Sequence, residues 1–229
     1  AMRSATFFGG RIVISGERGT ILFADDVDEF YLVDLDTPDW LEGVAASSNR
    51  VVAVGDNAAI YSSTNAVAWQ RQSVPFTNSL RSVAWGPPGF VIVGENGFIA
   101  SSSAATDWTV QTSGVSQHLN RVAWVSGQFW AVGNGGQVLA STNGSRWMPQ
   151  LSGATNALSA VAGSLMSQVV AGENEVRLRE GPLWTNQLAG SRLDSPPGWS
   201  YYSALWDGAG YWLGGAAGMW VQGFKTNAP

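Results

Sequence analysis

A repeat of 39 residues runs through most of the chain and constrains its fold more than any other feature. A glycine that follows a short apolar run recurs at intervals of 39, 39, 39, 39 and 43 residues, at Gly16, Gly55, Gly94, Gly133, Gly172 and Gly215. An aromatic residue keeps intervals of 39, 39, 39 and 37 residues, at Phe30, Trp69, Trp108, Trp147 and Trp184. Two independent markers with one period indicate a row of similar structural units, as in solenoids and propellers.

Residues 81–114 show the repeat in its most regular form, as four short strands. A V-A-W strand is followed by a V-I-V run closed by the marker glycine, by a strand ending in small polar residues, and by a strand opened by Trp108. Continuous apolar runs suit strands that are covered on both faces. We expect the glycine-rich turn to supply the positive φ of a tight hairpin. The sequence therefore predicts an all-β fold, a six-bladed β-propeller of about 39-residue, four-stranded repeats.

The period predicts one propeller domain over residues 1–229, with blades at about 4–37, 38–77, 78–116, 117–155, 156–194 and 195–229. The link after Trp184 is six residues longer than the others, which places a Pro- and Gly-rich insertion near residues 191–199. The fourth-strand aromatic of the last repeat would fall on Pro229, so its outer strand is expected to be missing. We therefore expect about 23 strands, with the ring closed by packing of the inner strands alone. We also expect the domain to belong to a larger protein.

The missing strand predicts an open edge on the third strand of the last blade. Unpaired strand edges are pairing sites. We expect this edge to meet a neighbouring domain, the C-terminal tail, or a second copy in a homo-oligomer, through Met219, Trp220, Val221 and Gln222.

Composition excludes several kinds of function. The net charge of −5 argues against nonspecific nucleic-acid binding. No apolar run reaches the roughly 20 residues of a membrane-spanning helix. The chain has no cysteine and a single histidine, His118, so a His- or Cys-based metal site is not expected. None of the glycine turns precedes a helical pattern, so we predict no phosphate loop. We also predict no metal and no cofactor.

The turn between the third and fourth strands carries a recognisable motif. Residues 141–147 read S-T-N-G-S-R-W, with degenerate copies at 63–69 and 102–108. The motif resembles the Asp-box of sialidase-like (BNR) propellers, with Asn143 and Asn65 where aspartate is usual. Over residues 4–224 the repeat also resembles the propellers of photosystem II assembly factors and of secreted bacterial surface proteins. The resemblance implies a structural hairpin that holds a tryptophan between blades, and an extracellular or periplasmic location; it implies no activity.

Polar residues are expected to gather at one mouth of the axial opening. In a propeller, the turns between the second and third strands lie on this face, together with the links between blades. The residue after each marker glycine therefore faces the mouth, at Glu17, Asp56, Glu95, Asn134, Glu173 and Ala216. Such an acidic and amide ring is able to bind a cation or ligand hydroxyls. The alternative is that these residues are simply good turn formers in solvent.

Several aromatic residues on the same face do not follow the 39-residue period: Trp40, Trp199, Tyr201 and Tyr202. Aromatics of this kind stack on sugars or anchor a protein partner. The alternative for Trp199 is that it packs the insertion onto its blade. Together with the mouth residues, the candidate ligand-binding set is Glu17, Arg18, Asp56, Glu95, Asn134, Glu173, Trp199, Tyr201 and Tyr202.

An enzyme must be considered because Arg18, Arg81 and Arg121 on this face are similar to the carboxylate-binding arginines of sialidases. That family also needs a tyrosine with a carboxylate partner and an aspartic acid, and catalytic carboxylates flank the ligand at about 5–10 Å. The dense acidic cluster lies instead at a turn on the opposite face, at Asp25, Asp26, Asp28 and Glu29. No nucleophile motif accompanies His118, so we predict no catalytic residues.

The leading hypothesis is a non-catalytic interaction or scaffolding propeller. It would bind a protein partner or a neighbouring domain through its axial face or its open edge. A carbohydrate-binding, lectin-like propeller is the alternative, and a sialidase-like glycoside hydrolase is the less favoured third reading.

Overall fold

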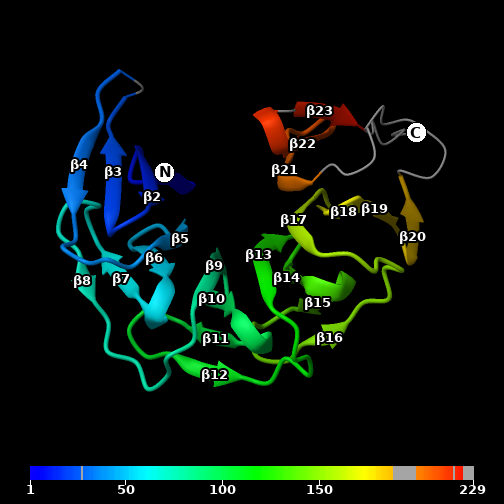
Figure 1. Cartoon of the computed structure of the whole chain (residues 1–229), viewed down its shortest axis with the longest axis horizontal. Coiled ribbons are helices and arrows are strands. Elements are labelled where there is room, and N and C mark those ends of the chain that lie inside the picture. Colours follow the sequence, from blue (N-terminus) through cyan, green and yellow to red (C-terminus); the bar gives the residue numbers. More distant parts are fainter. Residues whose placement is uncertain (27, 188–199, 219, 224–229) are drawn as a thin grey trace.

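The computed structural model describes residues 1–26, 28–187, 200–218 and 220–223 (Figure 1). Trp199, Met219 and the insertion at 191–199 lie outside these described residues. The predicted all-β propeller is confirmed: the described strands number 23 and form six antiparallel sheets. No helix in the described ranges is long and apolar enough to cross a membrane.

The first three sheets correspond to the first three predicted blades, each with its strands in chain order. The strands are β1 (Met2–Phe8), β2 (Arg11–Gly16), β3 (Thr20–Ala24), β4 (Tyr31–Asp34), β5 (Leu41–Ala46), β6 (Val51–Gly55), β7 (Ile60–Ser63), β8 (Gln70–Arg71), β9 (Leu80–Gly86), β10 (Gly89–Gly94), β11 (Ile99–Ser102) and β12 (Thr109–Gln111).

The remaining three sheets follow the same plan, and the last has three strands in the described part of the chain. The strands are β13 (Leu119–Val125), β14 (Gln128–Gly133), β15 (Val138–Ser141), β16 (Met148–Pro149), β17 (Leu158–Gly163), β18 (Ser167–Gly172), β19 (Glu175–Glu180), β20 (Leu183–Asn186), β21 (Tyr201–Trp206), β22 (Tyr211–Gly215) and β23 (Trp220–Gly223).

The core lies between neighbouring sheets. Val52 and Val54 of β6 pack with Phe90 and Ile92 of β10 in one buried cluster. Alternate residues of a strand point to opposite faces, so the second strand of an interior blade needs an apolar residue at every position. This is why β6 and β10 read as continuous apolar runs, and both are buried along their whole length.

In the described part of the chain the ring of sheets is open, so the inner strands do not close it as predicted. Each inner strand packs against the next one, from β1 through β5, β9, β13 and β17 to β21. No comparable packing joins the first sheet to the last among the described residues, and Figure 1 shows an interval between β1–β4 and β21–β23.

The glycine-rich turn supplies the predicted positive φ, but the marker glycine itself does not. Gly94 is extended, at φ −166°, and the positive φ values fall on the next turn residues, with Asn96 at 56° and Gly97 at 69°. A Cβ on Gly94 would lie 2.3 Å from the carbonyl oxygen of Ser79. Glycine is therefore required at this position because another segment of backbone approaches it closely.

Candidate axial binding site

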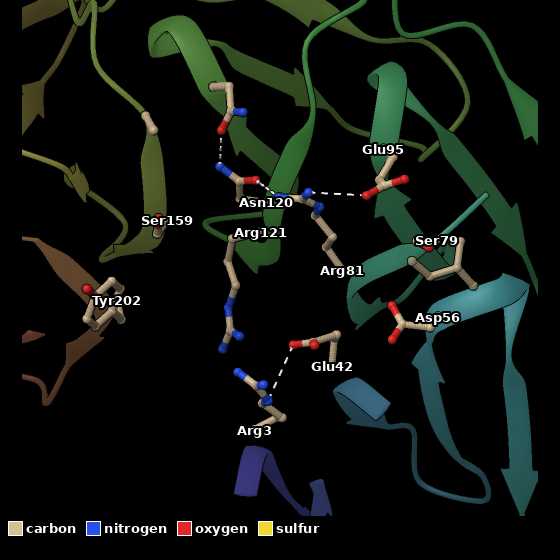
Figure 2. Close-up of a pocket in the computed structure, with 13 residues that line it drawn as sticks. Arg3, Glu42, Asp56, Ser79, Arg81, Glu95, Asn120, Arg121, Ser159 and Tyr202 are labelled. Carbon is tan, nitrogen blue, oxygen red and sulfur yellow. Dashed lines mark hydrogen bonds and ion pairs between the residues drawn. The ribbon is translucent and has the colours of Figure 1, made fainter. Parts of the chain in front are cut away.

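A pocket of about 580 Å³ lies where the inner strands converge, and residues from all six sheets line it (Figure 2). The first strand of every sheet contributes a residue that is skipped in the pairing with the second strand. In β9, Leu80 pairs with Gly94 and Ser82 with Val93, which leaves Arg81 as a β-bulge. The skipped residues of the six sheets are Arg3, Glu42, Arg81, Asn120, Ser159 and Tyr202, and each lines the pocket.

The bulge explains why these side chains reach the axis, because a bulge locally bends a strand and redirects a side chain. Sequence reasoning missed this ring as a group. The signal was nevertheless periodic, since each bulge residue stands thirteen positions before its marker glycine. Residue types at this position vary from arginine to tyrosine, so the ring does not resemble a conserved apolar core position.

Two of the pocket arginines are paired with carboxylates. Arg3 lies 3.2 Å from Glu17 and 3.9 Å from Glu42. Arg81 lies 3.4 Å from Glu95 (Figure 2). All of these groups are partly exposed, so each pair contributes at most about 1 kcal/mol to stability. The pairs mainly fix the arginines in place.

Asn120 connects three sheets at the pocket wall. Its side-chain oxygen accepts a hydrogen bond of 2.8 Å from Arg81, and its amide nitrogen donates to Asn134 Oδ1 at 2.8 Å and to the Leu158 carbonyl at 2.9 Å. These three contacts fix the orientation of the amide, so this wall of the pocket is preorganised.

Arg121 differs from the other two arginines. It follows the bulge residue of β13, at a position where the other five blades carry the small residues Ser4, Gly43, Ser82, Ala160 and Ser203. Figure 2 shows its side chain extending into the middle of the pocket, in the direction of Arg3. Within the described part of the chain its guanidinium has no hydrogen bond and no carboxylate partner, and burial lowers its pKa. The pocket therefore holds a partly buried cation that lacks a counter-ion among the described residues.

The structure places some of the predicted mouth residues at the pocket and others away from it. Asp56, Glu95 and Asn134 line the pocket, and Glu17 reaches it indirectly by holding Arg3. Their backbone amides are fixed by the links that precede the inner strands; the Asp56 amide, for example, donates to the Trp40 carbonyl at 3.0 Å.

Arg18 and Glu173 are not among the lining residues. Arg18 is an exposed turn residue with φ 52°, and Glu173 pairs its backbone with Ser200. These two candidates therefore stand apart from the site.

The two candidate tyrosines differ in exposure: one lines the pocket and the other is buried in the core. Tyr202 is the bulge residue of β21, lines the pocket, and is 59% exposed. Tyr201 is 0% exposed and belongs to the buried cluster between the fifth and sixth sheets, so its assignment to the binding face is wrong. It occupies the position of Leu41 and Leu80 in the repeat and therefore follows the period after all. Trp199 lies outside the described residues.

Trp40 and His118 contact residues that lie beside the pocket. The guanidinium of Arg3 lies 4.5 Å from the ring centre of Trp40, which is 40% exposed. His118 Nδ1 accepts a hydrogen bond of 3.0 Å from the backbone amide of Asn96, which links the third and fourth blades. Neither residue lines the pocket, so both act on its surroundings.

The acidic cluster is outside the pocket, at the turn between β3 and β4. Its Glu29 hydrogen-bonds Tyr31, and this bond together with the negative charge of the carboxylate raises the pKa of that phenol. Across the described ranges, no three His, Cys, Asp or Glu side chains come together in a way that would hold a metal ion.

The predicted open edge on β23 has both exposed and inward-pointing side chains. β23 pairs with β22 and with no other strand in the described part of the chain. Trp220 is 66% exposed and Gln222 is exposed, whereas Val221 points inward and packs against the buried cluster of the fifth and sixth sheets. Two of the three described edge residues are therefore available to a partner.

Comparison with known proteins supports the fold. No family model matches the sequence, and no curated protein sequence is similar to it. A solved structure described as YCF48 bound to D1 peptide is similar over 100% of this chain and 79% of its own, with TM-score 0.75 and 20% identity. YCF48 from Cyanidioschyzon merolae is similar over 96% and 94%, with TM-score 0.59 and 14% identity.

A third similar structure is the extracellular domain of the putative hybrid two component system BT4673 from B. thetaiotaomicron. The similarity spans 96% of this chain and 32% of that one, with TM-score 0.73 and 10% identity. These similarities support the predicted propeller architecture and concern the fold alone.

Proposed function

We propose that this chain is a non-catalytic protein-binding propeller whose axial pocket holds a carboxylate-bearing peptide segment of its partner. The observation that carries the proposal is Arg121, a partly buried guanidinium without a counter-ion in the described part of the chain. A guanidinium presents a planar fork of N–H donors that matches a carboxylate with two hydrogen bonds. A ligand carboxylate would thus supply the missing counter-ion.

The surroundings of Arg121 favour a peptide. Arg3 and Arg81 add positive charge nearby but are already held by Glu42 and Glu95. Asp56 lines the same pocket and has no cationic partner among the described residues, so it offers an acceptor for N–H groups. A peptide carries both a carboxylate and backbone N–H donors, and Tyr202 provides an apolar wall with a polar tip.

The comparisons are compatible with this proposal. One propeller of similar fold is described as bound to a D1 peptide, and another is described as an extracellular domain. We propose a corresponding role for this chain, as a scaffolding or assembly module that acts in an extracellular or periplasmic compartment.

A carbohydrate-binding propeller is the second candidate. Sugar recognition commonly uses exposed aromatic rings, and Tyr202 is such a ring at the pocket wall. Because Tyr201 is buried, the described residues offer less stacking surface than the sequence suggested. A sialidase-like hydrolase is favoured less, because Arg81 is already paired and the acidic cluster lies outside the pocket.

The test is binding to a peptide array in which acidic peptides are paired with copies that carry Gln and Asn in place of Glu and Asp. Binding is expected for the acidic members and is expected to weaken by at least about tenfold in Arg121→Met, since a charge-assisted pair contributes about 1.5–3 kcal/mol. Arg18→Met is the matched control, because it removes an arginine outside the pocket. Its affinity should equal that of the parent protein.

The outcomes separate the candidates. Equal binding by the acidic and amide peptides, or by the parent and Arg121→Met, would contradict the proposal. Binding to a glycan array that is lost in Tyr202→Ala would assign the pocket to carbohydrate instead.

A further inference from the structure

Among the described residues, one apolar face of the first sheet is uncovered. Phe7 is 76% exposed and Leu32 is 65% exposed, and Ile12, Ile14 and Leu22 are only partly buried. These side chains share a face, because the strand register pairs Phe7 with Ile12, Ile14 with Leu22, and Leu22 with Leu32. They form a continuous apolar surface across β1–β4, which we call the leading face.

The last sheet has a matching surface. Leu205 is 58% exposed and pairs with Trp212, which is partly buried. Trp220 lies over Gly214, where a Cβ would be 3.1 Å from its ring, and so belongs to the same side of the sheet. We call this side, formed by Leu205, Trp212 and Trp220, the trailing face.

Neither face has the pattern of an ordinary solvent-exposed sheet side. At the repeat positions of Ile12 and Ile14, the second and third blades carry Val51, Ala53, Phe90 and Ile92, all buried against the preceding blade. At the repeat position of Trp212, the other blades carry residues buried against the following blade: Val13, Val52, Val91, Trp130 and Val169. At all five of these positions, the residue is covered by another sheet of the same chain.

The leading and trailing faces belong to the two sheets that border the open interval in Figure 1. We propose that this interval takes one further β-sheet of the same blade type, apolar on both sides and covalently continuous with this chain. The sheet is expected to be continuous because all five sheet-to-sheet contacts of the structure join sheets that are consecutive in the chain. Large contiguous apolar patches on a soluble protein mark interaction sites.

Side-chain sizes at the contacts between blades indicate which residues the added sheet would carry. At two blade contacts, a residue nine positions before the marker glycine meets one eight positions before the marker of the preceding blade. A Cβ on Gly86 would lie 2.4 Å from the ring of Trp124, and a Cβ on Gly163 would lie 2.4 Å from Val125 Cγ1. One partner is large and the other small in both cases. Phe7 holds the first of these positions and is large, so the incoming sheet is expected to carry glycine or another small residue opposite it.

Direct contact between the two faces, within one molecule or between two copies, would match these positions poorly. The residue eight positions before the last marker glycine is Asp207, so Phe7 would be brought opposite a carboxylate. That carboxylate is already fixed by hydrogen bonds of 2.6 Å from Trp212 and 2.8 Å from the Gly210 amide. Burying an aspartate against a phenyl ring is unfavourable, which favours an added sheet over a second copy.

The experiment places a copy of residues 78–117 directly before Ala1. This graft keeps the 39-residue interval between marker glycines and sets its own Gly86 opposite Phe7. We expect the grafted protein to bind less of the hydrophobic dye ANS, to remain monomeric by light scattering, and to unfold at a higher denaturant concentration. The parent chain is measured beside it.

Size-swap variants make the test specific. Gly86→Trp within the graft should abolish these gains, because its ring would collide with Phe7. Adding Phe7→Gly should restore them, since the pair would then match as Val125 and Gly163 do. A graft that leaves ANS binding and the unfolding midpoint unchanged would overturn the proposal. So would a parent chain that dimerises and becomes monomeric on Leu205→Asp, because the occupant would then be a second copy.

Discussion

The carbonyl oxygen of Ser79 lies so close to Gly94 that a Cβ there would be 2.3 Å from it. The same oxygen accepts a hydrogen bond of 3.1 Å from the Glu95 amide. This contact joins the link that enters β9 to the turn that leaves β10, and it therefore positions Arg81 and Glu95 together at the pocket. Gly133 and the His118 carbonyl repeat the arrangement, with a corresponding distance of 2.1 Å.

Gly94→Ala is expected to lower the free energy of unfolding by about 3 kcal/mol or more, because the new Cβ collides with backbone that cannot yield cheaply. Gly114→Ala is the control. It places a Cβ in open space at φ 76°, where only the left-handed conformation costs about 1–2 kcal/mol. Guanidinium denaturation followed by tryptophan fluorescence measures both. Equal losses in the two variants would contradict the close-approach explanation.

The turn before Trp108 lacks an asparagine that the second and fourth blades have. Asn143 Oδ1 accepts hydrogen bonds of 3.0 Å from the amides of Ser145 and Arg146, and Asn65 does the same for the turn before Trp69. The third blade carries Ala104 at this position, and the buried hydroxyl of Ser102 has no partner.

We expect Ala104→Asn to stabilise the protein by about 1 kcal/mol, since it would supply a partner for Ser102 and for the turn amides. Asn143→Ala should destabilise by about 1–2 kcal/mol for the converse reason. Thermal and denaturant unfolding of the two single variants measure both effects. A neutral or destabilising Ala104→Asn alongside a costly Asn143→Ala would show that the third-blade turn has a different geometry.

Arg121→Met should separate stability from binding. It replaces a partly buried, uncompensated cation by an apolar side chain of similar length, so the free energy of unfolding is expected to rise by about 1 kcal/mol. Binding of acidic peptides should fall in the same variant. Arg18→Met, which changes an exposed turn, should alter neither quantity. A destabilised Arg121→Met would indicate that the guanidinium has a compensating partner.

The carboxyl of Asp207 offers a pH prediction. Hydrogen bonds from Trp212, and then from the amides of Ala209 and Gly210, lower its pKa. A carboxyl with a lowered pKa in the folded state stabilises the fold above its unfolded pKa, and this contribution is lost as pH falls through the folded pKa.

Trp212→Phe removes the largest cause, so the pKa of Asp207 should rise toward its ordinary value and the contribution should be lost at a higher pH. NMR titration of the carboxyl carbon measures the shift. Trp220→Phe is the control, because Trp220 lies on the same face and makes no bond to Asp207 among the described contacts. An unchanged pKa in Trp212→Phe would contradict the assignment.

The sequence alone determined the number of sheets in this chain, the order of their strands and the outline of the axial face. These features are local or periodic: apolar runs such as 90–93 mark buried strands, and each marker glycine fixes one turn. The same period placed Asp56, Glu95 and Asn134 correctly at the pocket. Because the 39-residue period recurs over most of the chain, it predicted the fold without comparison to another protein.

Only the tertiary structure decided which side chains reach the axis and whether the ring closes. The bulge that turns Arg81 inward exists only once two strands are paired. Among the described residues, the isolation of Arg121 depends on Glu42 pairing with Arg3 of the preceding blade and on Glu95 pairing with Arg81. The open interval follows from how the sheets pack side by side, and no single repeat contains that information.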